Sequence, residues 1–417
     1  MALNFAEASN VLKDVYQPAI REQLNQSIML LEQVGRDYTS IEGEEAVVSL
    51  HTGRNSGVGA RAENGALPTA GQQSYLQTRI PVKYLYSRIQ VSGPVIEGMK
   101  SDTGSFTRAI ESESKGLIND LKRDLNRQLY TPSNGAIGNA VSTVTGASGT
   151  ITFATEAEAR RLEVGMLVDI YDEDFTADDT NVTVTAVDVP TKTVTFDDLE
   201  TTVDADDLVV RAGVVPTAVS SKATEDLQYE VHGLEDIVAT GTSTTGNSSG
   251  IATPWLHGVS GAASTIWQST VTAASAAPTD SVFEEAMDEV YLDSGEDIDL
   301  IVTSHKASRA FAATQKSQKR HVNTQDLKGG FQALTVQTGR GAVALYPERD
   351  CLDDVAFLLN TSHLTNWIMA DWAFMDRDGA VLNRIANTDA YEATMYRYHE
   401  FGTDRRNAHG KLVSLTV

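Results

Sequence analysis

Cysteine is almost absent from this chain of 417 residues, because Cys351 is the only one. A single cysteine excludes an intrachain disulfide, which fits synthesis in the cytosol. Cys351 lies within ERDCLDD, and neighbouring acids raise the pKa of a thiol, so we expect a buried, inert side chain. Uninterrupted apolar runs of membrane-spanning length are also missing, so no membrane span or membrane partner is expected. The first residues, MALNFAEASN, lack the basic and apolar segments of a secretion signal.

Positive charge is scarce. The chain has 33 basic against 57 acidic residues, a net charge of −24, and only 12 of the bases are lysine. A DNA enzyme or sequence reader needs a concentrated basic face, which is not visible here. The acidity has two interpretations, ordinary solubility charge or adaptation to high salt. We favour the second, because molar salt shortens the screening length to about 3 Å and removes the self-repulsion. A halophilic organism is therefore expected as the site of synthesis.

Motifs for catalysis and cofactor binding are missing as well. The glycine-rich run at 53–59 lacks the Lys-Ser/Thr of a phosphate-binding loop, and the run at 258–261 is one residue short of a nucleophile elbow. The eight histidines form no HExxH motif and no close pair in sequence, so no zinc site is expected. Acidic clusters between 172 and 207 lack the twelve-residue calcium pattern and are interpreted as a solvated face. We therefore expect no enzyme, no catalytic residues, no cofactor and no metal.

The most informative segment that is present covers residues 47–93. It is typical of two β-strand arms, at 47–50 and 78–91, joined by a tip that contains five glycines and Pro68. Such a tip is far longer than an ordinary hairpin connection. The outward positions of the second arm are expected to be Arg, Lys, Ser and Gln. An isolated two-stranded ribbon is marginal in water, so we expect it to lie on a neighbouring subunit.

A long helix is predicted directly after this segment, over residues 102–130. Apolar side chains recur there at helical spacing, namely Phe106, Ile110, Leu117, Ile118, Leu121, Leu125 and Leu129. The helix would have roughly 25 residues and a length close to 40 Å.

Residues 1–135 resemble the major capsid protein family of tailed bacteriophages and tailed archaeal viruses, which has the Johnson fold. The resemblance is carried by HTGRNSGVGARAENGALPTAGQQ, followed by PVKYLYSRIQVSGP and the helix start SDTGSF. In that family an N-terminal arm leads into an extended E-loop and then a long spine helix. The resemblance is weaker over 214–417 and does not cover 140–212.

The resemblance implies an α+β phage major capsid fold. The expected units are an N-terminal arm at 1–46, the E-loop at 47–93, the spine helix and peripheral domain at 94–139 and 213–235, the axial domain at 236–385, a peripheral-domain strand at 386–408 and a closing axial strand at 409–417. For the arm, amphipathic helices over 5–34 leave open a plain helical hairpin packed on its own domain.

Residues 140–212 form a separate pattern. Short Thr- and Val-rich strands with turn residues every 8 to 12 positions predict an inserted small all-β domain of five or six strands, a barrel or a sandwich. A short helix near 156–162 is the exception. Farther along, helices are expected at 281–292 and 304–318, and strands at 299–303, 342–346, 355–359, 388–402 and 411–417.

The implied function is that of a major capsid protein, a virion component that self-assembles into hexamers and pentamers of an icosahedral shell around double-stranded DNA. Expected partners are copies of itself, a separate scaffolding protein, a portal, a decoration protein and weak, non-specific contact with DNA. Inter-subunit contacts are expected from Arg54, Arg61, Arg79, Lys83 and Arg88, with Arg54 and Arg61 anchoring the tip. Some capsids of this fold crosslink an E-loop lysine, but no covalent crosslink is expected from Lys83.

Two other classes remain open at this point. An encapsulin-like cellular compartment shares the fold and packages an enzyme. A hydrolase or surface adhesin with a β-rich insertion would form a small discrete oligomer.

Overall fold

The computed structural model describes residues 28–94, 103–142, 144, 149–172, 174–197, 199, 202–217, 221–241, 247–249, 254–317, 324–328, 332–376 and 381–417. The amphipathic segment expected over 5–34 lies mostly outside these residues, and only α3 (Met29–Gln33) falls within them. Helices and strands are mixed, as expected for an α+β fold. Among the described helices, none combines the length and apolar character needed to cross a membrane.

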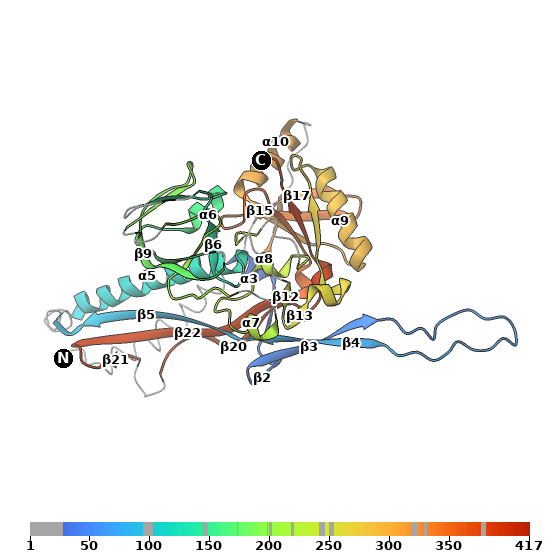
Figure 1. Cartoon of the computed structure of the whole chain (residues 1–417), viewed down its shortest axis with the longest axis horizontal. Helices are drawn as coiled ribbons and strands as arrows, with labels where there is room; N and C mark the ends of the chain where they lie inside the picture. Colours follow the sequence, from blue (N-terminus) through green and yellow to red (C-terminus); the bar gives the residue numbers. More distant parts are fainter. Residues whose placement is uncertain are drawn as a thin grey trace.

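A five-stranded sheet forms the long base of the molecule (Figure 1). Its order is β1-β20-β22-β21, and β5 pairs with β22. The strands are β1 (Gly35–Asp37), β5 (Lys83–Ser92), β20 (Leu364–Phe374), β21 (Asn383–Arg384) and β22 (Ala390–Thr403). The last of these confirms the long strand expected at 388–402.

The predicted long helix is α5 (Thr103–Tyr130), of 28 residues. It runs beside β5 (Figure 1). Its apolar stripe includes Ile118, Leu121, Leu125 and Leu129, which are buried in the largest hydrophobic cluster of the molecule. Burial of one face over this length, at roughly 25 cal/mol per Å² of apolar surface, fixes the helix on the sheet.

A ribbon projects from the end of this base (Figure 1). It consists of β3 (Glu45–Gly53) and β4 (Ser74–Pro81), paired antiparallel from Glu45↔Pro81 to Gly53↔Ser74, and β2 (Ile41–Glu42) extends β3. We call residues 54–73, between the paired strands, the tip. The extended ribbon and its long connection agree with the sequence pattern.

The inserted all-β unit is a six-stranded sheet with the order β6-β11-β8-β9-β10-β7. Val141 N–H donates to Thr152 O at 2.8 Å, and the adjacent Ala140↔Phe153 bridge joins the two edge strands, so the sheet closes into a small barrel with its own apolar core. The elements are β6 (Ala136–Asn139), β7 (Thr150–Thr152), α6 (Glu156–Arg161), β8 (Leu167–Tyr171), β9 (Ala177–Asp188), β10 (Thr193–Phe196) and β11 (Leu208–Arg211). The barrel therefore begins at 136, a few residues before the expected 140.

The buried carboxyl group of Asp207 makes the stability of this barrel depend on pH. This side chain is buried, and burial together with Asp178, Asp172 and Asp204 raises its pKa to about 6. The folded pKa of Asp207 exceeds its unfolded value. The contribution of this residue to the stability of the chain is therefore full below about pH 4 and is lost as pH rises through 6. Asp207→Asn should keep the acceptor for Asp204 N–H, 2.6 Å away, and stabilise the chain at pH 7 by about 1 kcal/mol after allowance for screening.

Thermal unfolding at pH 4 and pH 7 measures this effect, and molar KCl should shrink it. Asp206→Asn, an exposed neighbour, is the matched control and should change little. An equal gain for both variants would show that burial of Asp207 does not matter.

A seven-stranded mixed sheet with the order β14-β23-β19-β15-β18-β17-β16 makes the remaining unit. Helices α9 and α10 cover one face, with Phe283 and Phe311 in edge-to-face contact. The elements are β14 (Thr270–Ala273), α9 (Asp280–Ser294), β15 (Leu300–Ser304), α10 (His305–Ser317), β16 (Thr324–Asp326), β17 (Gln332–Thr338), β18 (Gly341–Glu348), β19 (Ala356–Leu359) and β23 (Gly410–Val413). The helices and strands expected from 281 onward are found, although the closing strand expected at 411–417 ends at Val413.

Short elements connect these units. They are α7 (Lys222–Glu225), α8 (Leu234–Ile237), β12 (Trp255–Leu256), β13 (Val259–Ser260), η2 (Gly261–Ala263), η3 (Thr265–Trp267), η5 (Thr361–His363) and η6 (Arg406–Ala408).

Two strand assignments differ from expectation. The expected second arm, 78–91, is two strands, and its second part, β5, pairs with β22 and not with β3. Likewise β20, expected within the 236–385 unit, pairs with β22 and β1 in the five-stranded sheet. The partners β22 of β5 and β1 of β20 are distant in sequence, so local pattern alone did not reveal these pairings.

Candidate assembly surfaces

The base of the ribbon is firmly held by the rest of the chain. Arg79 N–H donates to His257 O at 2.8 Å, and Val82 N–H donates to Glu44 O at 3.2 Å. Glu45 pairs with Lys222 at 2.5 Å and with Arg79 at 3.3 Å. These charge-assisted bonds hold the pKa of the Glu45 carboxyl below its usual range. The ribbon therefore leaves the body in a defined direction.

The tip, in contrast, is stabilised by local contacts of its own backbone. Gly57 N–H donates to Asn55 Oδ1 at 2.6 Å, and Gly65 N–H donates to Ala62 O at 2.9 Å. The Arg61 guanidinium donates to Ala66 O at 3.1 Å and to Ala60 O at 3.0 Å. Arg61 thus shapes the tip and remains exposed, as does Arg54.

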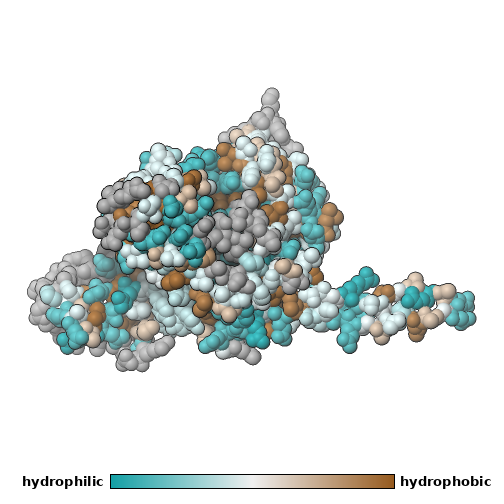
Figure 2. Space-filling model, in the orientation of Figure 1, coloured by the Kyte–Doolittle hydropathy of each residue, from teal (hydrophilic) through white to brown (hydrophobic). Residues whose placement is uncertain are grey.

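Apolar side chains are exposed along the ribbon and its tip. The exposed fractions are 87% for Leu67, 69% for Val58 and 67% for Tyr75. Figure 2 shows hydrophobic and hydrophilic residues interspersed on this projection, away from the body. Such apolar surface costs free energy in water, and several large apolar side chains exposed on one projecting ribbon favour a contact with another subunit.

A second apolar surface lies on the five-stranded sheet, which we call the tyrosine face. Tyr84 and Tyr86 of β5 are half-exposed, and Tyr398 of β22 contacts both in edge-to-face geometry, with ring centroids 5.0 and 5.9 Å away. The alternate residues Ile89 and Met395 point the other way, into the core. Arg88 and Gln90 are exposed as expected, but the tyrosine face was missed from sequence because Lys83 and Ser87, which lie on the opposite face, were also assigned outward.

The prediction that Lys83 makes an inter-subunit contact is wrong for the folded chain. Pro81, Val82 and Lys83 are all buried, and the strand is interrupted at Val82, so the alternation changes phase between β4 and β5. Lys83 Nζ donates to Gln228 O at 2.7 Å and to Glu225 O at 3.2 Å. Burial lowers the pKa of Lys83, although Glu400 and Glu225 oppose the shift.

The remaining arginines have partners within the chain. Arg79 pairs with Glu45, as described, and Arg88 pairs with Glu392 of the neighbouring strand at 3.2 Å. Both guanidinium groups remain largely exposed. The structure therefore brings Arg54 and Arg61 together in the tip and leaves Arg79 and Arg88 at the ribbon base and on the sheet.

The comparison with known families decides the identity of the chain. The SU10 major capsid protein model matches residues 107–416, about three quarters of the sequence. The chain belongs to this family. It is a major capsid protein of a tailed phage, and the resemblance noted in the sequence is confirmed.

The fold agrees with that of a solved phage capsid structure. The capsid protein of Cyanophage A-1(L) is similar, with a TM-score of 0.54, 12% identity and coverage of 93% of both chains. The Myoviridae phage XM1 capsid matches with a TM-score of 0.43, 8% identity and coverage of 93% of this chain and 91% of that one. The SrpI encapsulin of Synechococcus elongatus matches with a TM-score of 0.44, 11% identity and coverage of 91% and 85%. Among curated proteins, none matches.

Cys351 is buried in this capsid protein, as expected. Burial raises the pKa of its thiol well above the usual range, which suppresses the reactive thiolate.

Proposed function

We propose that this capsid protein assembles into hexamers and pentamers of an icosahedral shell around double-stranded DNA, with the ribbon overlapping a neighbouring subunit. The supporting observation is the tip, which exposes Val58 and Leu67 and makes its hydrogen bonds locally, with Tyr75 of β4 exposed beside it. A neighbouring copy that covers these side chains would recover the apolar burial that the monomer lacks. Icosahedral repetition then sums many modest contacts, each reduced by the ordering cost of a long loop.

The tyrosine face is proposed as a second contact surface. Tyrosine supplies a large amphipathic area with few rotatable bonds and is enriched at protein interfaces. Tyr84, Tyr86 and Tyr398 already contact one another, so little side-chain entropy remains to be lost on binding.

The division into capsid domains follows the strand pairing. We assign the ribbon and tip, now ending near residue 82, to the E-loop and the seven-stranded sheet to the axial domain. The five-stranded sheet, with β5 and β20, and α5 form the peripheral domain and spine. The barrel is the inserted domain.

Further partners are proposed from family membership. They are a separate scaffolding protein, a portal, a decoration protein and weak, non-specific contact with DNA, with synthesis in the host cytoplasm. A structural role without catalysis is the proposed activity. Membership of a viral capsid family favours this over the encapsulin-like compartment and over a hydrolase or adhesin.

A halophilic host is proposed from the net charge of −24. In molar salt, exposed ion pairs are screened within about 3 Å, so contacts that persist must be apolar or partly buried. The exposed apolar residues of the tip supply contacts of that kind.

Arg61→Glu tests the role of the tip. The variant should leave the subunit folded and reduce the yield of shells at least tenfold. It removes the donors to Ala60 O and Ala66 O and places a negative charge against an acidic neighbour. Sedimentation and negative-stain electron microscopy measure the yield.

Arg61→Lys is the matched control for this substitution. It keeps the charge but loses the planar guanidinium fork, so an intermediate yield is expected. Normal shells from Arg61→Glu would contradict the proposed role of the tip.

A further inference from the structure

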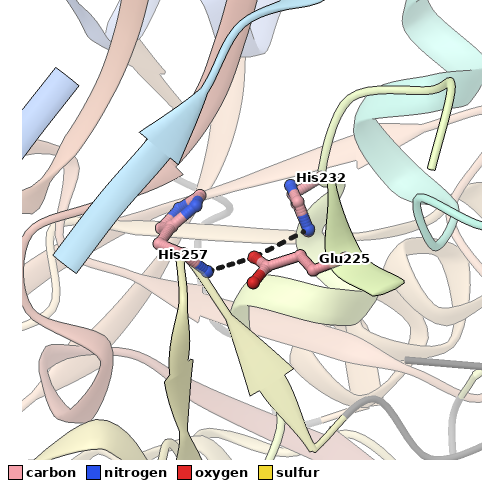
Figure 3. Close-up of side chains that lie close together, drawn as sticks. All are labelled: Glu225, His232 and His257. Atoms are coloured by element: carbon pink, nitrogen blue, oxygen red, sulfur yellow. Dashed lines mark hydrogen bonds and ion pairs between the residues drawn. The ribbon is translucent and has the colours of Figure 1, made fainter. Parts of the chain in front are cut away.

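Three buried side chains from separate local elements meet beneath the base of the ribbon. Glu225 ends α7, His232 follows it in the segment that leads to α8, and His257 lies in the turn between β12 and β13 (Figure 3). All three are essentially inaccessible to solvent. The sequence contains no close histidine pair, so this cluster was not predicted.

The potential ligand atoms of the cluster converge on one point. One carboxylate oxygen of Glu225 and one ring nitrogen from each histidine lie within 4.8 Å of one another. His232 Nε2 and Glu225 Oε1 lie 3.4 Å apart. This distance matches the edge of a tetrahedron whose ligands lie about 2.05 Å from a central zinc ion.

The imidazole nitrogens of His257 lack hydrogen-bond partners, although the ring is fully buried. The nitrogens of His232 also make no hydrogen bond, but each faces a carboxylate at ion-pair distance. Leaving a buried polar group unsatisfied costs about 1–3 kcal/mol. Burial also lowers the pKa of His257 well below its usual range, which leaves its ring neutral and its lone pair available.

The backbone around His257 is arranged to present this ring. His257 has φ of +53° and Gly258 has φ of +75°, so the non-glycine residue occupies the left-handed region. Glu225 stabilises the turn by accepting from the backbone N–H groups of His257 and Gly258. Gly402 provides the space for the ring, since a Cβ there would lie 2.1 Å from His257 Nε2.

His232 has the orientation of a supported ligand. Its Nε2 faces Glu225, and its Nδ1 lies 3.5 Å from Glu400 Oε1. Metal-bound histidines commonly direct the second nitrogen at a carboxylate, which fixes the ring and increases its basicity. Glu400 is itself held by the N–H groups of His232 and Phe401 at 2.8 and 3.0 Å.

Two cationic side chains near the cluster, Lys83 and Arg406, donate to backbone carbonyls. Lys83 donates to the carbonyls of Glu225 and Gln228. Arg406 donates to the carbonyls of Asp236 and Ile237. The carboxylates of Glu225 and Glu400 offset both charges, so a divalent cation does not enter a site of net positive charge.

We propose that Glu225, His232 and His257 bind one divalent transition-metal cation, with Zn²⁺ as the best match. Two imidazoles and one carboxylate suit zinc better than magnesium or calcium, which prefer oxygen ligands throughout. The cation would join α7, the 232 segment and the β12–β13 turn. Because Arg79 of the ribbon bonds to His257 O, this junction lies at the point where the ribbon leaves the body.

Metal titration of the full-length chain, first stripped with a chelator, tests the proposal. We expect one Zn²⁺ per chain at micromolar free zinc, and an increase in melting temperature on binding. Cobalt substitution should give the intense visible absorption of a four-coordinate site. A chain that binds no stoichiometric zinc under these conditions would overturn the proposal, with His232 then held as an imidazolium between Glu225 and Glu400.

Substitution of ligands assigns the site. His257→Gln and Glu225→Gln should each weaken zinc binding about 100-fold or more and abolish the cobalt spectrum, with near-native circular dichroism. His51→Gln, which removes an exposed ribbon histidine, should bind as the parent chain does. Retention of parental affinity in both ligand variants would refute the assignment. Should either variant misfold, zinc binding by His232→Gln and the cobalt spectrum of the parent chain decide whether this cluster binds the metal.

Discussion

Replacing residues 54–73 with an Asn-Gly turn is expected to abolish shell formation and to leave the subunit folded. The pairing ends at Gly53↔Ser74, and a two-residue Asn-Gly turn suits antiparallel strands at that point. The deleted tip carries Leu67 and Val58, which are largely exposed, and its hydrogen bonds are local. The rest of the subunit therefore loses little stability, whereas the contact with a neighbouring subunit is lost.

The measurement combines sedimentation for assembly with thermal unfolding for the subunit. The melting temperature should remain unchanged, and the shell fraction should fall below detection. The matched control replaces Leu67 alone with Ser, which keeps the length of the tip and should reduce assembly partially. Shells of normal yield from the shortened chain would show that the tip makes no essential contact.

Arg161→Met is expected to destabilise the chain by about 3–5 kcal/mol, the range for breaking a buried ion pair. Arg161 and Glu235 are both fully buried and 3.2 Å apart. The guanidinium also donates to the carbonyls of Asp350, Ile137 and Tyr130. It therefore joins helix α6 of the barrel to the end of α5 and to the seven-stranded sheet, and its loss leaves several buried acceptors unsatisfied.

Arg160→Met is the matched control, because this neighbouring arginine is partly exposed and its ion pair with Asp353 is longer, at 3.4 Å. We expect a loss of no more than about 1 kcal/mol for it. The double variant Arg161→Met with Glu235→Gln should recover part of the stability, since the uncompensated charge is removed. Denaturant unfolding gives the three values, and equal losses for both single arginine variants would contradict this role.

Much of the fold was predictable because it rests on local periodicity. The stripe of α5 repeats at helical spacing over 28 residues, and the barrel strands carry regular turn signals. The phase of β5 was not predictable, because a single interruption at Val82 moves Lys83 from the surface to the interior. The place of β20 was missed because its partners β1 and β22 are determined by tertiary packing.

The assembly surface was only partly predictable. Arg54 and Arg61 follow from the glycine-rich tip, and their contacts with a neighbour stay a prediction. The tyrosine face needed the pairing of β5 with β22, which local sequence does not encode. Glu225, His232 and His257 come together only in the folded chain.

Negative-stain electron microscopy of the recombinant chain, in molar KCl and in dilute buffer, tests the central claim most directly. The account predicts closed shells, or rings of five and six subunits, in molar KCl and fewer of them in dilute buffer, where a net charge of −24 is unscreened. Small compact particles under both conditions would contradict self-assembly through the ribbon.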